Sequence, residues 1–220
     1  MKNDEILLLY EFRTGDNFET ENIIYTLKDL YIGKNCRLKE VYSKGTLYVD
    51  ENSEVRAIAS DSDMFLGKNV FIKRWIDSMK SIFVSAKCNL GVVASAGENI
   101  VLSQGVKFER LFAKRIMTYN IAKEKEKDSY IIGTIKSDED IEIKGNIEIV
   151  GNLISEGKIK LHDNVAVKGN VFSQVDIELN NGIRIGIENK IKSVVANGKV
   201  ILGEDVIVYG FISSKEGETK

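Results

Sequence analysis

The 220-residue sequence predicts an all-β fold, a single-stranded parallel β-helix of about ten stacked rungs, where a rung is one full coil of 17–18 residues. Three observations predict this fold. An aliphatic residue followed two positions later by a small residue recurs along the chain, mostly at steps of 17 or 18 residues. Apolar residues come in i, i+2 pairs, the alternation of a short strand with one buried face. The chain also contains no proline, which indicates few irregular loops.

The aliphatic–small pair fixes the frame of the repeat. Its small members follow one another at steps of 17, 18, 17, 18, 24, 18, 18, 23 and 18 residues. The pairs are Val41–Ser43, Ile58–Ser60, Ile76–Ser78, Val93–Ser95, Leu111–Ala113, Ile135–Ser137, Leu153–Ser155, Val171–Ser173, Val194–Ala196 and Ile212–Ser214.

Two further apolar pairs complete each rung, as Leu30–Ile32 and Cys36–Leu38 do in the first. Polar corners rich in Gly, Asn, Asp and Lys separate the pairs. Three short strands and three corners predict a triangular cross-section, with successive coils hydrogen-bonded in parallel about 4.8 Å apart. The column that begins at Leu30 continues through Leu47, Met64, Ile82, Ile100, Ile141, Ile159, Ile177 and Val200.

The spacing also predicts how the chain is divided. Residues 1–29 are expected to form an N-terminal cap segment, 30–119 the N-terminal half of the β-helix, and 131–214 its C-terminal half. Residues 120–130 form a charged loop in the 24-residue step, and 215–220 a short tail. The 23-residue step holds a second insertion at 186–192, and solenoids place such insertions on their surface.

The residues that could carry catalysis have simpler structural explanations. His162, the only histidine, falls in a corner column that elsewhere holds Gly, Asp or Ser. Cys36 and Cys88 share an inward column three rungs apart, roughly 14 Å, which is too far for a disulfide. The recurring serines are too many equivalent copies for a nucleophile. We therefore expect no enzyme, no cofactor and no metal site.

One outward column is unusually apolar for a surface. It carries an aromatic ladder in the N-terminal half and mostly charged residues in the C-terminal half. Three explanations stay open: the N-terminal segment Ile6–Phe12 covers the ladder, a lateral partner covers it, or it is simply exposed. The ladder consists of Tyr31, Tyr48, Phe65 and Phe83.

The C-terminal end is predicted to associate with another copy. A stack of parallel strands ends in unpaired N–H and C=O groups, and the last rung has the same apolar columns as interior rungs. With the N-terminal end capped, this gives a dimer; with both ends open, it gives a filament. The residues expected at this contact are Val200, Leu202, Val206, Ile207, Val208, Phe211 and Ile212.

Charge and hydropathy exclude two kinds of partner. The formal net charge is −2, with acids and lysines interspersed, so no basic face for nucleic acid is expected. No apolar run reaches the ~18 residues of a membrane span. A cytoplasmic protein without a transmembrane span is expected.

The segments GNLISEGKIKLHDNVAVKGNVFSQVDIEL and GKVILGEDVIVYGFISS resemble the repeats of bactofilins, polymer-forming bacterial cytoskeletal proteins. The resemblance is clearest from Gly133 to Ser214. It implies a right-handed β-helix that assembles end to end without nucleotide into nonpolar filaments, and a scaffold role in cell shape, at the inner face of the membrane among other places. The implied partners are further copies in a homo-oligomer or filament, and other bactofilin-like or membrane-associated proteins.

Two alternatives to the scaffold remain. The chain lacks long proline-containing tails and has two insertions, features that favour a non-polymerising interaction module. A left-handed β-helix acyltransferase also fits a length of 18 residues, or three hexapeptides. Only two of every three hexads begin with an aliphatic residue, however, which argues against that enzyme.

Overall fold

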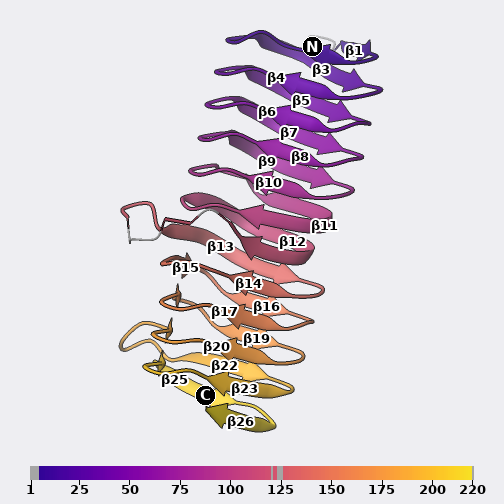
Figure 1. Cartoon of the computed structure of the whole chain (residues 1–220). Helices are drawn as coiled ribbons and strands as arrows, with labels where there is room; N and C mark the ends of the chain where they lie inside the picture. The colour runs from indigo at the N-terminus through magenta and orange to yellow at the C-terminus, as the bar shows by residue number, and fades with distance from the viewer. Residues whose placement is uncertain (1–4, 120, 123–125, 220) are drawn as a thin grey trace.

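The computed structural model of the chain is a parallel β-solenoid of about 12 rungs spaced about 18 residues apart, and it describes residues 5–119, 121–122 and 126–219. The described residues contain strands and turns but no helix. Figure 1 shows the rungs stacked along one axis, with β1 at one end of the stack and β26 at the other. The predicted fold class is confirmed, with about two rungs more than expected.

Each rung contributes strands to three faces. The first face carries one strand of two to four residues per rung. Its separate strands are β2 (Phe12–Arg13), β4 (Leu30–Ile32), β6 (Leu47–Val49), β8 (Met64–Leu66), β10 (Ile82–Val84), β14 (Ile141–Ile143), β17 (Ile159–Leu161), β20 (Ile177–Leu179), β23 (Lys199–Leu202) and β26 (Glu216–Thr219).

The second and third faces differ between the two halves of the molecule. In the N-terminal half, long strands run across the corner between them, which we call the third corner: β3 (Glu19–Thr26), β5 (Arg37–Ser43), β7 (Glu54–Ser60) and β9 (Phe71–Ser78). The first strand of the C-terminal half, β13 (Tyr130–Ser137), crosses this corner in the same way. β11 (Val93–Leu102) and β12 (Val106–Thr118) continue onto the first face as well. Three strands in every rung were expected, so these rungs correct the prediction.

In the C-terminal half the two faces carry separate short strands, as predicted. The second face holds β15 (Glu148–Val150), β18 (Ala166–Val167), β21 (Arg184–Ile185) and β24 (Ile207–Val208). The third face holds β16 (Leu153–Ser155), β19 (Val171–Ser173), β22 (Lys192–Ala196) and β25 (Gly210–Ser213), and at the other end of the stack β1 (Ile6–Leu9).

Glycine at the third corner explains the difference between the halves. A Cβ on Gly151 would lie 1.9 Å from the carbonyl oxygen of Gly133, and one on Gly169 would lie 2.1 Å from that of Gly151. Backbones of neighbouring rungs approach this closely only where no side chain intervenes. Most rungs of the N-terminal half have larger residues there, and their chain bends as a continuous strand instead. Gly91 is the exception in that half, and it separates the isolated bridge at Asn89 from β11.

The corner between the first and second faces uses the left-handed backbone conformation. Asn35, Asn52 and Asn69 occupy it with φ of 54°, 61° and 58°, and Asn164 and Asp205 do so further along. Asparagine and aspartate tolerate this conformation better than other L-residues because their short polar side chains bond locally. The side-chain amide of Asn69 donates to the side-chain oxygen of Asn52 over 3.0 Å, so the corners also form a ladder.

The core is a single stack of apolar columns inside the solenoid. The predicted first-face column from Leu30 to Val200 is buried throughout, and Ile116 belongs to it as well. The serine column is buried at Ser43, Ser60 and Ser78 and again at Ser155 and Ser173. Its hydroxyls donate to backbone carbonyls, for example Ser60 Oγ to the oxygen of Gly45 over 2.7 Å.

One rung is shifted by one residue from the prediction. Ala94 pairs with Ile76, and Ala96 pairs with Ser78. Ala94 and Ala96 are therefore the inward residues, whereas Val93 and Ser95 are only half-buried. The predicted pair Val93–Ser95 is wrong by one position.

Residues 6–26 form rungs rather than a cap. β1 pairs in parallel with β3, and β2 pairs in parallel with β4. The predicted tail also continues the stack, because β26 pairs with β23 in parallel. These segments supply the additional rungs, and they show that the boundaries predicted at 29 and 215 are wrong.

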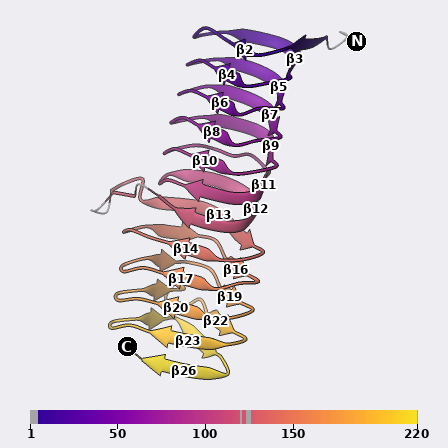
Figure 2. The ribbon, with the colours of Figure 1, turned by 45° about the vertical axis from the view of Figure 1, so that its right-hand side comes forward.

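The two insertions leave the stack at its surface. Of the predicted loop 120–130, residues 120 and 123–125 lie outside the described part, and Tyr130 already begins β13. Asp128 in this insertion pairs with Lys87 over 2.8 Å. The second insertion, 186–192, makes a small turn closed by a bridge between Ile187 and Lys190, and its last residue begins β22. Figure 2 shows β2 and β3 at one end of the solenoid and β26 at the other.

Candidate functional site: the solenoid ends and an aromatic stripe

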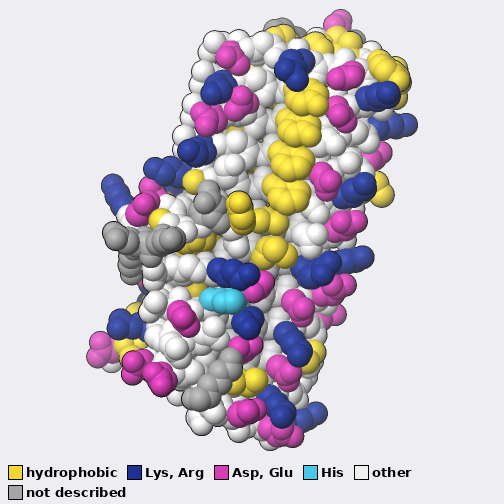
Figure 3. All heavy atoms as spheres, viewed as in Figure 1, with side chains coloured by type: hydrophobic (Ala, Val, Ile, Leu, Met, Phe, Trp, Pro, Cys, Tyr) yellow, Lys and Arg dark blue, Asp and Glu magenta, His cyan; other side chains and the backbone are white. Residues whose placement is uncertain are grey.

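The aromatic ladder is a continuous stripe of stacked rings on the first face. Ring centroids lie 4.6 Å apart for Tyr31 and Tyr48, 5.1 Å for Tyr48 and Phe65, and 4.8 Å for Phe65 and Phe83, with interplanar angles of 9° or less. Figure 3 shows them as a vertical hydrophobic band in the upper half of the molecule. We call these four residues the aromatic stripe.

Stacking fixes which part of each ring faces outward. The rings cover one another's faces, and the guanidinium of Arg13 lies 4.4 Å from the centroid of Tyr31 and covers the end of the stack. The stripe therefore offers ring edges to solvent, and about 36% of Phe65 and 37% of Phe83 remain exposed. A ligand that stacks on ring faces, such as a sugar or a base, finds no free face on Tyr31, Tyr48 or Phe65, and beyond Phe83 the column continues with Val101.

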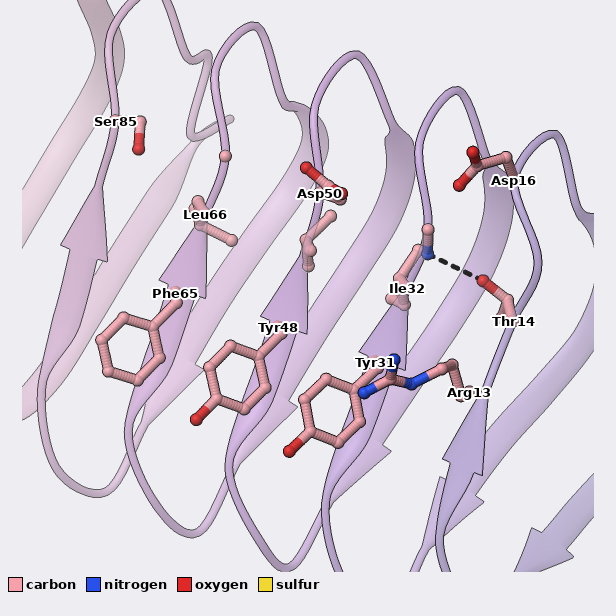
Figure 4. Close-up of a pocket in the computed structure, with 13 residues that line it drawn as sticks. Arg13, Thr14, Asp16, Tyr31, Ile32, Tyr48, Asp50, Phe65, Leu66 and Ser85 are labelled. Atoms are coloured by element: carbon pink, nitrogen blue, oxygen red, sulfur yellow. Dashed lines mark hydrogen bonds between the residues drawn. The ribbon is translucent and has the colours of Figure 1, made fainter.

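A groove runs beside the stripe. It has a volume of about 460 Å³, and its walls include Asp16, Asp50, Leu66 and Ser85 as well as the rings. Figure 4 shows Arg13, Tyr31, Tyr48 and Phe65 in one row, with Asp16 and Asp50 on the corner beyond. The groove thus has apolar walls beside polar ones, and the polar walls carry Arg13 as well as Asp16 and Asp50.

The N-terminal segment does not cover the stripe, contrary to one of the explanations proposed from the sequence. Ile6–Leu9 pairs with β3 on the third face. Only Phe12 and Arg13 reach the first face, where they extend the column above Leu30 and Tyr31. In the single chain the stripe is open.

In the C-terminal half the same column carries charges that pair along the axis. Lys160 contacts Glu178 over 3.2 Å. Glu142 accepts from Lys144 over 3.0 Å and lies 2.7 Å from Nε2 of His162. Although burial opposes the effect, these hydrogen bonds hold the pKa of Glu142 below its ordinary value. His162 lies in a corner, as predicted, and its described partner is this carboxylate.

The thiols of the two cysteines lie in the core. Cys36 and Cys88 are both free and buried, as expected from their column. Burial raises the pKa of the Cys88 thiol to about 11, so it is protonated at neutral pH.

Among the described residues, no cluster of three or more His, Cys, Asp and Glu side chains could hold a metal ion. No helix in the described part of the chain is long and apolar enough to cross a membrane.

The C-terminal end is only partly as predicted. Val200 is buried, because β26 lies over β23 and pairs Val200 with Gly217 and Leu202 with Thr219. Leu202, Val206 and Val208 are partly buried and pack against the core. The exposed members of the predicted contact are Ile207, Phe211 and Ile212, with 42%, 55% and 40% of their surface accessible.

The N-terminal end is also an open strand edge, which the sequence reasoning missed. Within the described residues, β1 is hydrogen-bonded only to β3, and β2 only to β4. Ile6 and Leu8 are 66% and 64% exposed. The signal was present in the sequence, because Leu7 and Leu9 precede Ile24 and Thr26 by 17 residues.

The architecture places the chain in the class of parallel β-solenoids. No family model, no curated protein and no solved structure matches it. The resemblance to bactofilins consequently rests on the repeat sequence.

Proposed function

We propose that this protein is a structural scaffold whose solenoids associate end to end into filaments, in the manner of the bactofilin cytoskeletal proteins that its repeats resemble. The observation that carries the proposal is that both ends of the described stack are strand edges bonded on one side only, with apolar side chains exposed on β1 and β25. Such edges pair readily with further strands unless they are blocked.

The surface chemistry of the ends supports association. Solenoids that remain monomeric have polar terminal rungs. Here β1 has the sequence ILLL, and β25 exposes Phe211 and Ile212, although the last strand of the C-terminal rung, β26, has the polar sequence EGET. Adding a rung to either end buries these side chains and pairs the free backbone groups, two favourable contributions that act together.

Sedimentation velocity tests the proposal directly. The wild-type protein is expected to form species larger than a monomer, in proportions that rise with concentration and without nucleotide or metal. Phe211→Arg places a charge in the contact and should shift the population to monomer. Met79→Arg is the matched control: Met79 is 67% exposed but lies on an interior rung, so assembly should be unchanged. A wild-type protein that stays monomeric at high micromolar concentration would refute the proposal.

A second candidate, an interaction module that binds a partner laterally, is favoured by the open aromatic stripe and its groove. Under this alternative Phe65→Lys disrupts the lateral contact, whereas Phe211→Arg leaves it intact. Electron microscopy of the two variants distinguishes bundles of filaments from single filaments and from separate rods.

A further inference from the structure

We propose that copies of this chain join head to tail, with the C-terminal rung of one solenoid stacked on the N-terminal rung of the next, which gives the filament a polarity. This inference rests on the proposed end-to-end assembly and specifies its geometry. It differs from the nonpolar arrangement that the bactofilin resemblance implies.

Strand direction is the first argument. Every strand pair along the solenoid is parallel, from β1 with β3 to β23 with β26. Stacking a C-terminal end on an N-terminal end continues that pattern into the next copy. Stacking two like ends makes the strand pairs across the junction antiparallel, which breaks the parallel pattern of the solenoid.

The spacing between columns is the second argument. On most interior rungs the inward residue of the third face and that of the first face are six positions apart, as for Ile24 and Leu30. On the first rung they are Leu7 and Phe12, five apart. On the last rung they are Ile212 and Gly217, also five apart. Both terminal corners are shortened equally, so Ile212 can stack on Leu7 while Gly217 stacks on Phe12.

Side-chain size agrees with this register. Gly217 occupies a column that otherwise holds large apolar residues, and a Cβ there would meet nothing within 4 Å. The matching position on the opposite end is Phe12, the largest residue of the column. The ring of Phe12 from the next copy therefore fits the space beneath Val200 that Gly217 leaves.

Charge agrees as well. Glu218 continues the outward first-face column beyond Ile201. Arg13 begins the same column above Tyr31. The junction thus sets Glu218 of one copy against Arg13 of the next. Two residues earlier, Glu216 would face Glu11, but Glu216 is already paired with Lys199 over 3.1 Å, which reduces the repulsion.

At the head-to-tail junction, the strands of the third face continue from one copy into the next, whereas those of the second face do not. Phe211 and Ile6 share an outward third-face column, and Ser213 and Leu8 share another. On the second face, the first described strand residues of a copy are Glu19 and Thr20, one turn further along. Ile207 and Val208 therefore gain no partner strand at the junction from the described residues.

Engineered cysteines test the polarity. Leu8→Cys and Ser213→Cys place one thiol at each end, at positions predicted to be neighbours across the junction and within disulfide reach. Because the two native cysteines are buried, the wild-type protein should form no disulfide crosslinks and is the negative control. Under mild oxidation, a mixture of the two variants should give a disulfide-linked heterodimer, and each variant alone should remain uncrosslinked. The double variant should give a ladder of multimers.

Each result has a distinct meaning. Crosslinking of Ser213→Cys alone, or of Leu8→Cys alone, shows that like ends meet, and overturns the head-to-tail inference while leaving end-to-end assembly intact. Assembly without any crosslink overturns the register that places Leu8 beside Ser213. If the protein never assembles, the proposed scaffold function is itself refuted.

Charge reversal gives an independent readout. Arg13→Glu and Glu218→Arg should each weaken assembly several-fold, because each creates a like-charge pair at every junction. Mixing them should restore assembly: alternating copies place the reversed pair at one junction and the wild-type pair at the next. With like ends joined, Arg13 never meets Glu218, so each single variant replaces one like-charge contact by another. Neither variant alone should then weaken assembly, an outcome that overturns the inference.

Discussion

At the scale of single residues, burial alone decides how far a position tolerates change. Val167 is fully buried between Ile149 and Ile185, in successive rungs of one column. An ionised side chain there would lie between two apolar layers, with no partner and no route to water.

Val167→Asp is accordingly expected to lower the free energy of unfolding by several kcal/mol, about 3 or more. Urea denaturation measures the effect. Lys168→Gln is the control, since Lys168 points outward and contributes only an exposed pair with Glu148 at 2.7 Å. If both variants unfold at the same urea concentration as the wild type, the register of this column is wrong.

Asp176 provides a pH-dependent contribution at the same scale. Its carboxylate accepts the backbone N–H of Lys199 over 2.9 Å and lies 3.5 Å from the ammonium of Lys158. The hydrogen bond from Lys199 is the main cause that holds the pKa of Asp176 below its ordinary value of 3.8, and burial opposes it.

A lowered pKa in the folded state means that the stabilisation is complete above the ordinary value and is lost as the pH falls through the folded value. Asp176→Asn should therefore be less stable than the wild type at neutral pH, by less than about 1 kcal/mol because the pair is partly exposed. The difference should vanish in strong acid. Melting temperatures of the two proteins, recorded at several pH values from neutral to acid, measure this difference. Glu188→Gln, at an exposed position, is the control. A difference that is independent of pH contradicts the assignment.

At the scale of elements, the corners determine whether a rung has two strands or three. The short strands of the C-terminal half depend on glycine at the third corner, where rungs approach within contact distance of the backbone. Residues with a Cβ at this corner lie mostly in the continuous bends of the N-terminal half, although Lys192 occupies it at the second insertion.

Gly151→Ala should therefore destabilise the protein by about 3 kcal/mol, because the added methyl meets the carbonyl of Gly133. Gly15→Ala is the matched control, since a Cβ at Gly15 meets nothing within 4 Å. Differential scanning calorimetry compares the two. Equal melting temperatures would show that the corner has room for the methyl group.

Most elements could be predicted from the sequence, because period-2 alternation and an 18-residue repeat leave little choice of fold. The exceptions have physical causes. In the segment VASA (93–96) both Val93–Ser95 and Ala94–Ala96 satisfy the aliphatic–small pattern, and the structure selects the pair that continues Ile76 and Ser78. The bend of the long strands could not be foreseen, because it depends on the close approach of neighbouring rungs.

The ends were the least predictable part of the candidate site. The columns of a terminal rung can be compared with a neighbouring rung on one side only, so the repeat is harder to recognise there. Arg13, which covers the end of the aromatic stripe, was missed for this reason. In the same way Gly217 and Glu218 were assigned to a tail, although they continue two columns of the stack.

At the scale of the whole molecule, stability is expected to decrease from the middle towards the ends. Each rung contacts mainly its neighbours, so interior rungs are held on both sides and terminal rungs on one. Amide hydrogen exchange should thus be slowest near β10 and β11 and fastest at β1 and at β25–β26 in the monomer.

Assembly should change this profile in a specific way. Raising the protein concentration should protect Ile6–Leu9 and Gly210–Ser213 together, because a head-to-tail junction pairs these two strands. Ile207–Val208 should gain less, because the second face is not continued there by the described residues. Phe211→Arg should remove the concentration dependence at both ends while leaving the interior slow. Protection that rises at Gly210–Ser213 but not at Ile6–Leu9 would indicate a tail-to-tail dimer. Protection confined to the first face around Tyr48 and Phe65 would indicate lateral pairing along the aromatic stripe.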